Sequence, residues 1–120
     1  MRNYDEAIEE RILMEIVVDA YDSVERAMGW YYYLEEKITF SFTATCVSVD
    51  KRTPLELGEE IEVMEMSGET YCRKDMLVDI LWNGKTLTVP LSQIKPLNAD
   101  DESNEAIDDW HYWVSRGYKF

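Results

Sequence analysis

The sequence predicts a single α+β domain in which helices at the two ends of the chain pack on a small antiparallel sheet. Apolar residues recur at helical spacing near both ends, they alternate with polar residues in the middle, and Asn83-Gly84 separates two strand-like runs. A chain of 120 residues suffices for one hydrophobic core. We therefore expect one domain over residues 1–120, helical over about 4–36, β over about 38–97 and helical over about 100–117.

The first helix is predicted over residues 4–18, because Ile8, Ile12 and Ile16 recur every four residues. The run from Ile16 to Val18 is β-branched, so the last turn of this helix could instead be extended.

A second helix is predicted over about residues 23–36, where Asp22 and Glu25 have the spacing of a capping box. An apolar stripe follows at helical spacing, formed by Val24, Ala27, Met28, Tyr31, Leu34 and Ile38. Gly29 either weakens this helix by about 1 kcal/mol relative to alanine or leaves room for a close neighbour. The aromatic run from Trp30 to Tyr33 is interpreted as core and not as a ligand-stacking platform.

Four to five short strands are predicted between the helices. They cover residues 40–46, the surroundings of Ile61 and Val63, residues 76–82, residues 86–91 and residues 95–97, with a 3₁₀-like turn at 92–94. Asn83-Gly84 is the strongest two-residue hairpin signal. This pattern favours a small SH3-like antiparallel barrel or bent sheet with two N-terminal helices and one C-terminal helix packed around it.

Asp79 interrupts the third predicted strand, which is otherwise apolar on both faces. Such a residue should pair with Arg or Lys, cap a helix or bind a metal. The pairing is favoured, because protein groups usually compensate buried charges.

The third helix is predicted over about residues 101–116 and ends at Gly117, a good C-terminal cap. Six of the ten residues from Asp100 to Asp109 are carboxylates and none is basic. On a helical wheel most of these acids share one side, and the apolar side consists of Ala106, Ile107, Trp110, Trp113 and Val114. The helix should therefore turn a bank of oxygen ligands outward.

The charge of the chain excludes several classes of function. There are 25 acidic and 12 basic residues, for a net charge of −13, with the excess towards the two ends. Such a field disfavours nucleic acid and anionic membranes, and it attracts cations and basic protein surfaces. The chain shows no signal-peptide core and no apolar run of membrane-spanning length, so a cytoplasmic location is expected. Cys46 and Cys72 are expected to remain thiols, Cys46 as a buried apolar residue.

Catalytic apparatus is not recognisable in the sequence. His111 is the only histidine, which argues against a zinc site or a nucleophile–histidine pair, and the five glycines form no phosphate-binding loop. We therefore predict a protein that is not an enzyme. An EF-hand loop is absent as well, so any calcium site must draw carboxylates from different elements.

Abundant carboxylates without nitrogen or sulfur ligands suit Ca²⁺, which takes six to eight oxygens. Nine residues are candidate metal ligands: Asp19, Asp22, Glu25, Glu35, Asp100, Asp101, Glu105, Asp108 and Asp109. Asp22 and Glu25 are explained more simply as a capping box, and Asp100 or Asp101 as the N-cap of the third helix.

The other candidates have no such local explanation. Asp19 ends a helix, where the macrodipole disfavours negative charge. Glu35 projects towards an apolar stripe and could also be a residue at its edge. Glu105, Asp108 and Asp109 have no local partner in the sequence. The acids around Glu60 and Glu62 are the weakest candidates, because they alternate outward as on a solvated strand.

Several stretches resemble the CcbP-type family of small calcium-binding proteins. They are Val17-Val18-Asp19-Ala20-Tyr21, Glu25-Arg26-Ala27-Met28-Gly29-Trp30 with Tyr33-Leu34, Val89-Pro90-Leu91-Ser92-Gln93, and Ala106-Ile107-Asp108-Asp109-Trp110-His111-Tyr112-Trp113 with Gly117-Tyr118. The resemblance implies a soluble intracellular protein that binds Ca²⁺ through surface acids and buffers or signals calcium.

A second hypothesis is an acidic interaction module whose barrel and helices bind a basic protein partner, without a physiological metal. Convergence of carboxylates from distant segments favours the calcium hypothesis, whereas an exposed groove with an apolar floor favours the interaction module.

Overall fold

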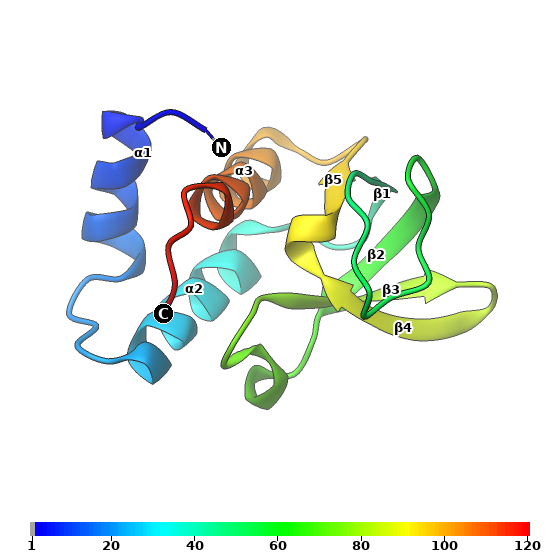
Figure 1. The fold of residues 1–120 in the computed structure, drawn as a ribbon, viewed down its shortest axis with the longest axis horizontal. Coiled ribbons are helices and arrows are strands. Elements are labelled where there is room, and N and C mark those ends of the chain that lie inside the picture. Colours follow the sequence, from blue (N-terminus) through cyan, green and yellow to red (C-terminus); the bar gives the residue numbers. More distant parts are fainter. Residues whose placement is uncertain (1) are drawn as a thin grey trace.

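The computed structural model describes residues 2–120. Three helical segments gather on one side of the molecule and a five-stranded sheet forms the other, and the two chain ends lie on the helical side (Figure 1). The helical layer consists of α1 (Glu6–Arg11), continued by the π-helix η1 (Ile12–Ile16), α2 (Ser23–Lys37) and α3 (Asp101–Ser115). The α+β prediction and the predicted element order are confirmed. No helix in the described part of the chain is long and apolar enough to span a bilayer.

The sheet is antiparallel throughout, with strand order β4-β3-β2-β1-β5. Its strands are β1 (Phe42–Cys46), β2 (Glu60–Met66), β3 (Leu77–Trp82), β4 (Lys85–Pro90) and β5 (Ile94–Pro96). Two 3₁₀ turns, η2 (Glu69–Cys72) and η3 (Leu91–Gln93), connect them. Because β4 and β5 are both edge strands, the sheet is not closed into a barrel, and the bent-sheet alternative is the correct one.

The β3–β4 hairpin has the turn that its sequence predicts. Asn83 and Gly84 have φ angles of 50° and 75°, in the left-handed region that these two residues tolerate. Asp79, on the outward face of β3, departs from the favoured expectation. It accepts a hydrogen bond from the Thr88 hydroxyl of β4 (2.7 Å) and forms no ion pair within residues 2–120.

The first helix keeps its helical form to Ile16, so the extended alternative for its last turn is wrong. The backbone N–H of Val17 donates to the carbonyl of Ile12 (2.9 Å), the five-residue spacing of a π-helix. Asp19 then turns the chain with a φ of 59°, a conformation in which aspartate is enriched among non-glycine residues. This backbone role explains an acidic residue just after a helix.

Gly29 is required by the contact between η1 and α2. A Cβ on Gly29 would overlap the carbonyl oxygen of Ile16, so the backbones of the two segments meet where only glycine fits. The close-neighbour interpretation of Gly29 is therefore confirmed.

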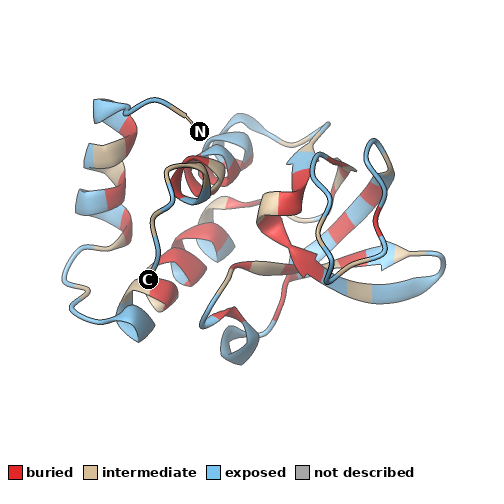
Figure 2. Cartoon of the chain, viewed as in Figure 1, coloured by how far each residue is buried: buried red, intermediate tan, exposed pale blue. Residues whose placement is uncertain are grey.

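Aromatic side chains fill the space between α2 and α3. Trp30 has no exposed surface, and its ring centroid lies 5.0 Å from that of Trp110 and 5.5 Å from that of Trp113. Tyr31 and Tyr33 are also buried, whereas Tyr32 is 52% exposed. The core interpretation thus holds for three of the four residues. Figure 2 shows the buried positions on the inward faces of the helices.

One buried carboxylate links the three helices. Asp109 of α3 has no exposed surface and accepts two hydrogen bonds from the Arg11 guanidinium (2.6 and 2.8 Å) and one from the Tyr33 hydroxyl (2.9 Å). Burial and the neighbouring Asp109 raise the pKa of Tyr33 above its ordinary value, so the phenol stays protonated and donates. The expectation that Asp109 faces solvent is wrong, because the wheel could not reveal its partners.

Replacing Gly29 by alanine is expected to destabilise the fold. Alanine is favoured over glycine by about 1 kcal/mol inside an exposed helix, but here overlap with Ile16 should lower the free energy of unfolding by about 1–3 kcal/mol. Urea denaturation measures this change. Glu36→Ala, at an exposed position of the same helix, serves as control and should stay within about 0.5 kcal/mol of wild type. A Gly29→Ala variant more stable than wild type would contradict the close contact.

Replacing Asp109 by asparagine is expected to cost about 3 kcal/mol or more, since it leaves the Arg11 guanidinium without its carboxylate in a mostly buried site. The matched control is Asp108→Asn, which removes the same charge one residue earlier. Asp108 pairs with Arg2 at the surface, with 56% of its side chain exposed, so its loss should cost about 1 kcal/mol or less. Equal shifts of the two denaturation midpoints would refute the distinction.

Candidate functional site

The acids of α3 meet bases from the N-terminal segment, α1 and α2. Arg2 contacts Asp108 (2.8 Å), Arg11 lies 3.8 Å from Glu105 as well as binding Asp109, and Lys37 of α2 lies 3.9 Å from Glu102. The α3 acids therefore lack partners within their own helix but have them in tertiary contacts. Arginine pairing makes Glu105, Asp108 and Asp109 poor candidates for metal ligands, because a cation must first displace a guanidinium.

Two acids at the start of α3, Asp100 and Asp101, form no ion pair with any base of the described residues. Asp100 is the N-cap, accepting a hydrogen bond from the Ser103 backbone N–H (2.8 Å), and hydrogen bonds from Ser103 lower the pKa of its carboxyl. Asp101 is exposed and has no ion pair among residues 2–120. Two residues before Asp100, the side-chain oxygen of Asn98 accepts a hydrogen bond from the backbone N–H of Thr43 in β1 (2.6 Å). Oxygen donors thus concentrate where the last strand leads into α3.

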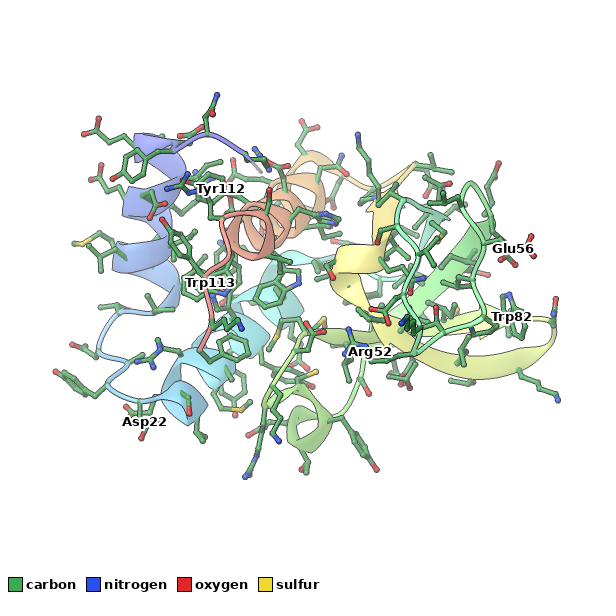
Figure 3. All side chains as sticks on the ribbon, viewed as in Figure 1. Asp22, Arg52, Glu56, Trp82, Tyr112 and Trp113 are labelled. Atoms are coloured by element: carbon green, nitrogen blue, oxygen red, sulfur yellow. The ribbon has the colours of Figure 1, made fainter. Side chains whose placement is uncertain are left out.

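Asp19, Asp22 and Glu25 lie at the turn between η1 and α2, and all three are exposed. Asp22 is the N-cap of α2 and accepts from the Glu25 backbone N–H (2.8 Å), which is one of the two hydrogen bonds of the predicted capping box. Figure 3 places Asp22 at the corner of the molecule where α2 begins. Each of the first two acids therefore has a structural role at this turn, and neither needs a metal to explain its presence.

Glu35 shares two tyrosine neighbours with a carboxylate that the sequence analysis did not select. The carboxylates of Glu35 in α2 and Glu69 in η2 both raise the pKa of the Tyr31 and Tyr32 phenols. Burial, and then the carboxylate of Glu35, raise the pKa of Tyr31 to about 12. Glu69 is the main cause of the raised pKa of Tyr32, and Glu35 adds to it. Two acids from different elements therefore influence the same two tyrosines.

A backbone carbonyl oxygen binds one of these two phenols. The hydroxyl of Tyr31 donates to the Ser67 carbonyl (2.9 Å), which fixes the segment before η2 against α2. No sequence pattern marks Glu69, because it stands in a four-residue 3₁₀ turn where apolar periodicity is not defined.

Glu9 is a second acid that the sequence analysis did not select. Its carboxylate accepts hydrogen bonds from the hydroxyls of Tyr112 (2.6 Å) and Tyr118 (2.7 Å). Tyr112 and Trp113 project from α3 into the space beside α1 (Figure 3). Glu9 thus joins the N-terminal helix to the end of α3, a role that only the tertiary structure reveals.

Asp50 and Asp75 converge on one base. Both carboxylates contact the same terminal nitrogen of Arg52, at 2.9 and 3.0 Å. Burial raises the pKa of Asp75 despite this contact. Arg52 supplies the compensating charge, so this pair is explained without a metal.

The oxygen donors are of the type that a hard cation prefers, but they are not arranged as a complete coordination shell. Within residues 2–120, no three acidic, histidine or cysteine side chains are grouped so as to hold a metal ion. Ca²⁺ takes backbone carbonyls and waters besides carboxylates. The carboxylates of Glu35 and Glu69 therefore suit calcium in donor type, and binding would require them to reorient towards a common ion.

Comparison with known proteins identifies relatives over almost the entire chain. A family model described as calcium binding, of the CcbP type, matches residues 10–114. The crystal structure of Anabaena CcbP superposes with a TM-score of 0.87 at 42% identity, covering 99% of this chain and 98% of that one. A calcium-binding protein in its calcium-binding form also has a TM-score of 0.87 at 42% identity, covering 97% and 95%. The comparison with curated proteins finds no match. On this evidence the chain belongs to the CcbP family of calcium-binding proteins.

Proposed function

We propose that this protein binds Ca²⁺ through surface carboxylates and acts as a cytoplasmic calcium buffer or sensor, without catalytic activity. Membership of a calcium-binding family supports the choice of ion, as does a net charge of −13. Oxygen is the donor that Ca²⁺ prefers, and unpaired carboxylates supply it together with the charge that favours cation binding.

The observation that carries the proposal is that Glu35 and Glu69 lie near the same two tyrosines and have no basic partner among residues 2–120. The two residues belong to different elements, α2 and η2, yet both raise the pKa of the Tyr31 and Tyr32 phenols. Neither glutamate forms an ion pair within the described residues. Like charges repel each other, and a divalent cation that draws the two carboxylates together would compensate both charges. We assign Glu35 and Glu69 as the principal ligands, with carbonyl and water oxygens completing the shell.

A second, weaker site is assigned to Asp100 and Asp101. Both are exposed at the start of α3, where Lys37 contacts only the next acid, Glu102. The N-terminal end of the helix dipole stabilises these carboxylates without metal and repels a cation, so this site should bind more weakly than the glutamate pair. Asp19, Asp22 and Glu25 remain candidates only for transient contacts, because they are exposed around a cap.

Calcium should raise the thermal stability of the protein. A ligand that binds only the folded state adds RT ln(1 + [L]/Kd), about 2.7 kcal/mol at a hundredfold excess over Kd. Melting curves recorded with Ca²⁺ and with chelator, at equal ionic strength, should therefore differ by several degrees. Mg²⁺ at the same concentration tests selectivity. Identical midpoints in Ca²⁺ and chelator would exclude calcium binding of functional strength.

The paired substitution Glu35→Gln with Glu69→Gln should weaken calcium binding about tenfold or more, because it removes two charged ligands while keeping side-chain size. Isothermal titration calorimetry measures the change. The control is Glu60→Gln with Glu62→Gln, which removes the same charge from the exposed face of β2 and should alter affinity by about twofold or less.

A further variant, Asp100→Asn with Asp101→Asn, separates the two assigned sites. It should abolish the weaker binding step and leave the stronger one, since asparagine still caps α3. If this variant loses the strong step and the glutamate variant keeps it, the order of the two sites is wrong.

A further inference from the structure

The outer face of α1 and η1 carries apolar side chains that the core does not cover. Ile8, Ile12 and Ile16 lie on the inner face and are at least 93% buried. Leu13 and Met14, on the opposite side of the same helical segment, are 64% and 62% exposed. Figure 2 shows this division, with α1 buried on the side facing α3 and exposed on its outer side. The helix thus has an apolar surface that none of the described residues covers.

A groove lies along the edge of this face, between the α1–η1 segment and Trp113 of α3. It has a volume of about 440 Å³, and Leu13, Met14 and Val17 form one wall while Tyr4 and Trp113 contribute on the side of α3. Trp113 is 9% exposed, so it forms a rigid base and not a mobile lid. An exposed groove with an apolar floor is the feature that distinguishes an interaction surface from an ordinary solvated helix.

The charge along the groove is of one sign. Glu6, Glu9 and Glu10 line it, and no basic side chain of the described chain does. Glu9 is held by two tyrosine hydroxyls and cannot swing out, whereas Glu6 and Glu10 are exposed and form no ion pair within residues 2–120. The acids occupy the N-terminal half of the face and the exposed apolar residues the C-terminal half.

We propose that this groove is a docking site for a basic amphipathic helix of a partner protein. A helix laid in an apolar groove presents side chains at spacings of three and four residues, so one of its faces can cover Leu13, Met14 and Val17. Lysine or arginine residues at one end of that helix would then lie over Glu6 and Glu10. Because the acidic and apolar halves are separate, the groove also fixes the direction in which the helix binds.

The same charges disfavour other occupants. Two copies of a chain with a net charge of −13 would bring like charges together, and an anionic membrane surface would meet the acidic side chains first. A basic helix is the occupant that gains from both the charge and the apolar floor. The inference goes beyond calcium binding and does not depend on it, so its test is run in chelator.

The probe is a fluorescein-labelled helical peptide of leucine and lysine, about 20 residues long, with one apolar face. Fluorescence anisotropy measures its affinity for the full chain at about 0.15 M salt, where diffuse electrostatic attraction is screened. The wild type should bind this peptide about tenfold or more tightly than a peptide of identical composition whose order is scrambled to remove the apolar face. Equal binding of the two peptides would overturn the proposal in favour of non-specific charge attraction.

Variants locate the binding. Leu13→Gln with Met14→Gln keeps helix-forming residues at exposed positions and should weaken peptide binding about tenfold. Its control is Val49→Gln with Leu57→Gln, two apolar residues of the β1–β2 loop that are 73% and 64% exposed. Glu6→Gln with Glu10→Gln should weaken binding severalfold and reduce its salt dependence, whereas Glu60→Gln with Glu62→Gln should not. If the two control variants lost binding to the same extent as the two groove variants, the proposal would be overturned.

Sedimentation velocity tests the alternative occupant. The chain should remain monomeric across the concentrations of the binding assay. A dimer that disappears in the Leu13→Gln, Met14→Gln variant would show that a second copy fills the groove, and it would overturn the assignment of a basic partner helix.

Discussion

The buried carboxylate of Asp109 in α3 organises the helical layer, because three hydrogen bonds from two other helices, α1 and α2, meet on it. Arg11 brings the N-terminal helix to α3, and the hydroxyl of Tyr33 brings α2. A carboxylate without exposed surface is tolerated only when its lone pairs are occupied and its charge is balanced. This requirement fixes the mutual position of the helices, and the aromatic contacts of Trp30 with Trp110 and Trp113 fill the remaining space.

The fixed position of the helices decides which acids remain available. Once Arg11 is committed to Asp109, it also lies near Glu105, and the N-terminal arrangement lets Arg2 reach Asp108. The acids of α3 are thereby largely neutralised within the protein. Glu35 and Glu69 lie elsewhere, at the contact between α2 and η2, where the described structure gives them no base. Calcium is proposed there because the fold leaves charge uncompensated at that contact.

The π-helix links the core to the exposed groove. Its carbonyl at Ile16 meets Gly29 of α2, so the inner face of the segment is fixed at backbone contact distance. The outer face, with Leu13 and Met14, is left open above Trp113. One short segment therefore anchors the helical layer on one side and offers an acid-lined apolar surface on the other.

The sequence by itself determined the secondary structure and the chemical class of the ligand. Apolar periodicity, capping residues and the Asn83-Gly84 turn are local signals, and they placed the helices and strands within a few residues of their observed bounds. Composition and charge pointed to a hard cation, and the resemblance to the CcbP-type family agrees with the family comparison.

Only the tertiary structure decided whether the sheet closes, which acids are paired with a base and which are not. Asp109 looked outward on a helical wheel because Arg11 lies 98 residues away in the chain. Glu69 carried no signal, since it stands in a four-residue 3₁₀ turn whose contact with α2 is made only by tertiary packing. Pairing of charges depends on contacts between distant segments, and those contacts are set by packing, which the order of residues in one segment does not encode.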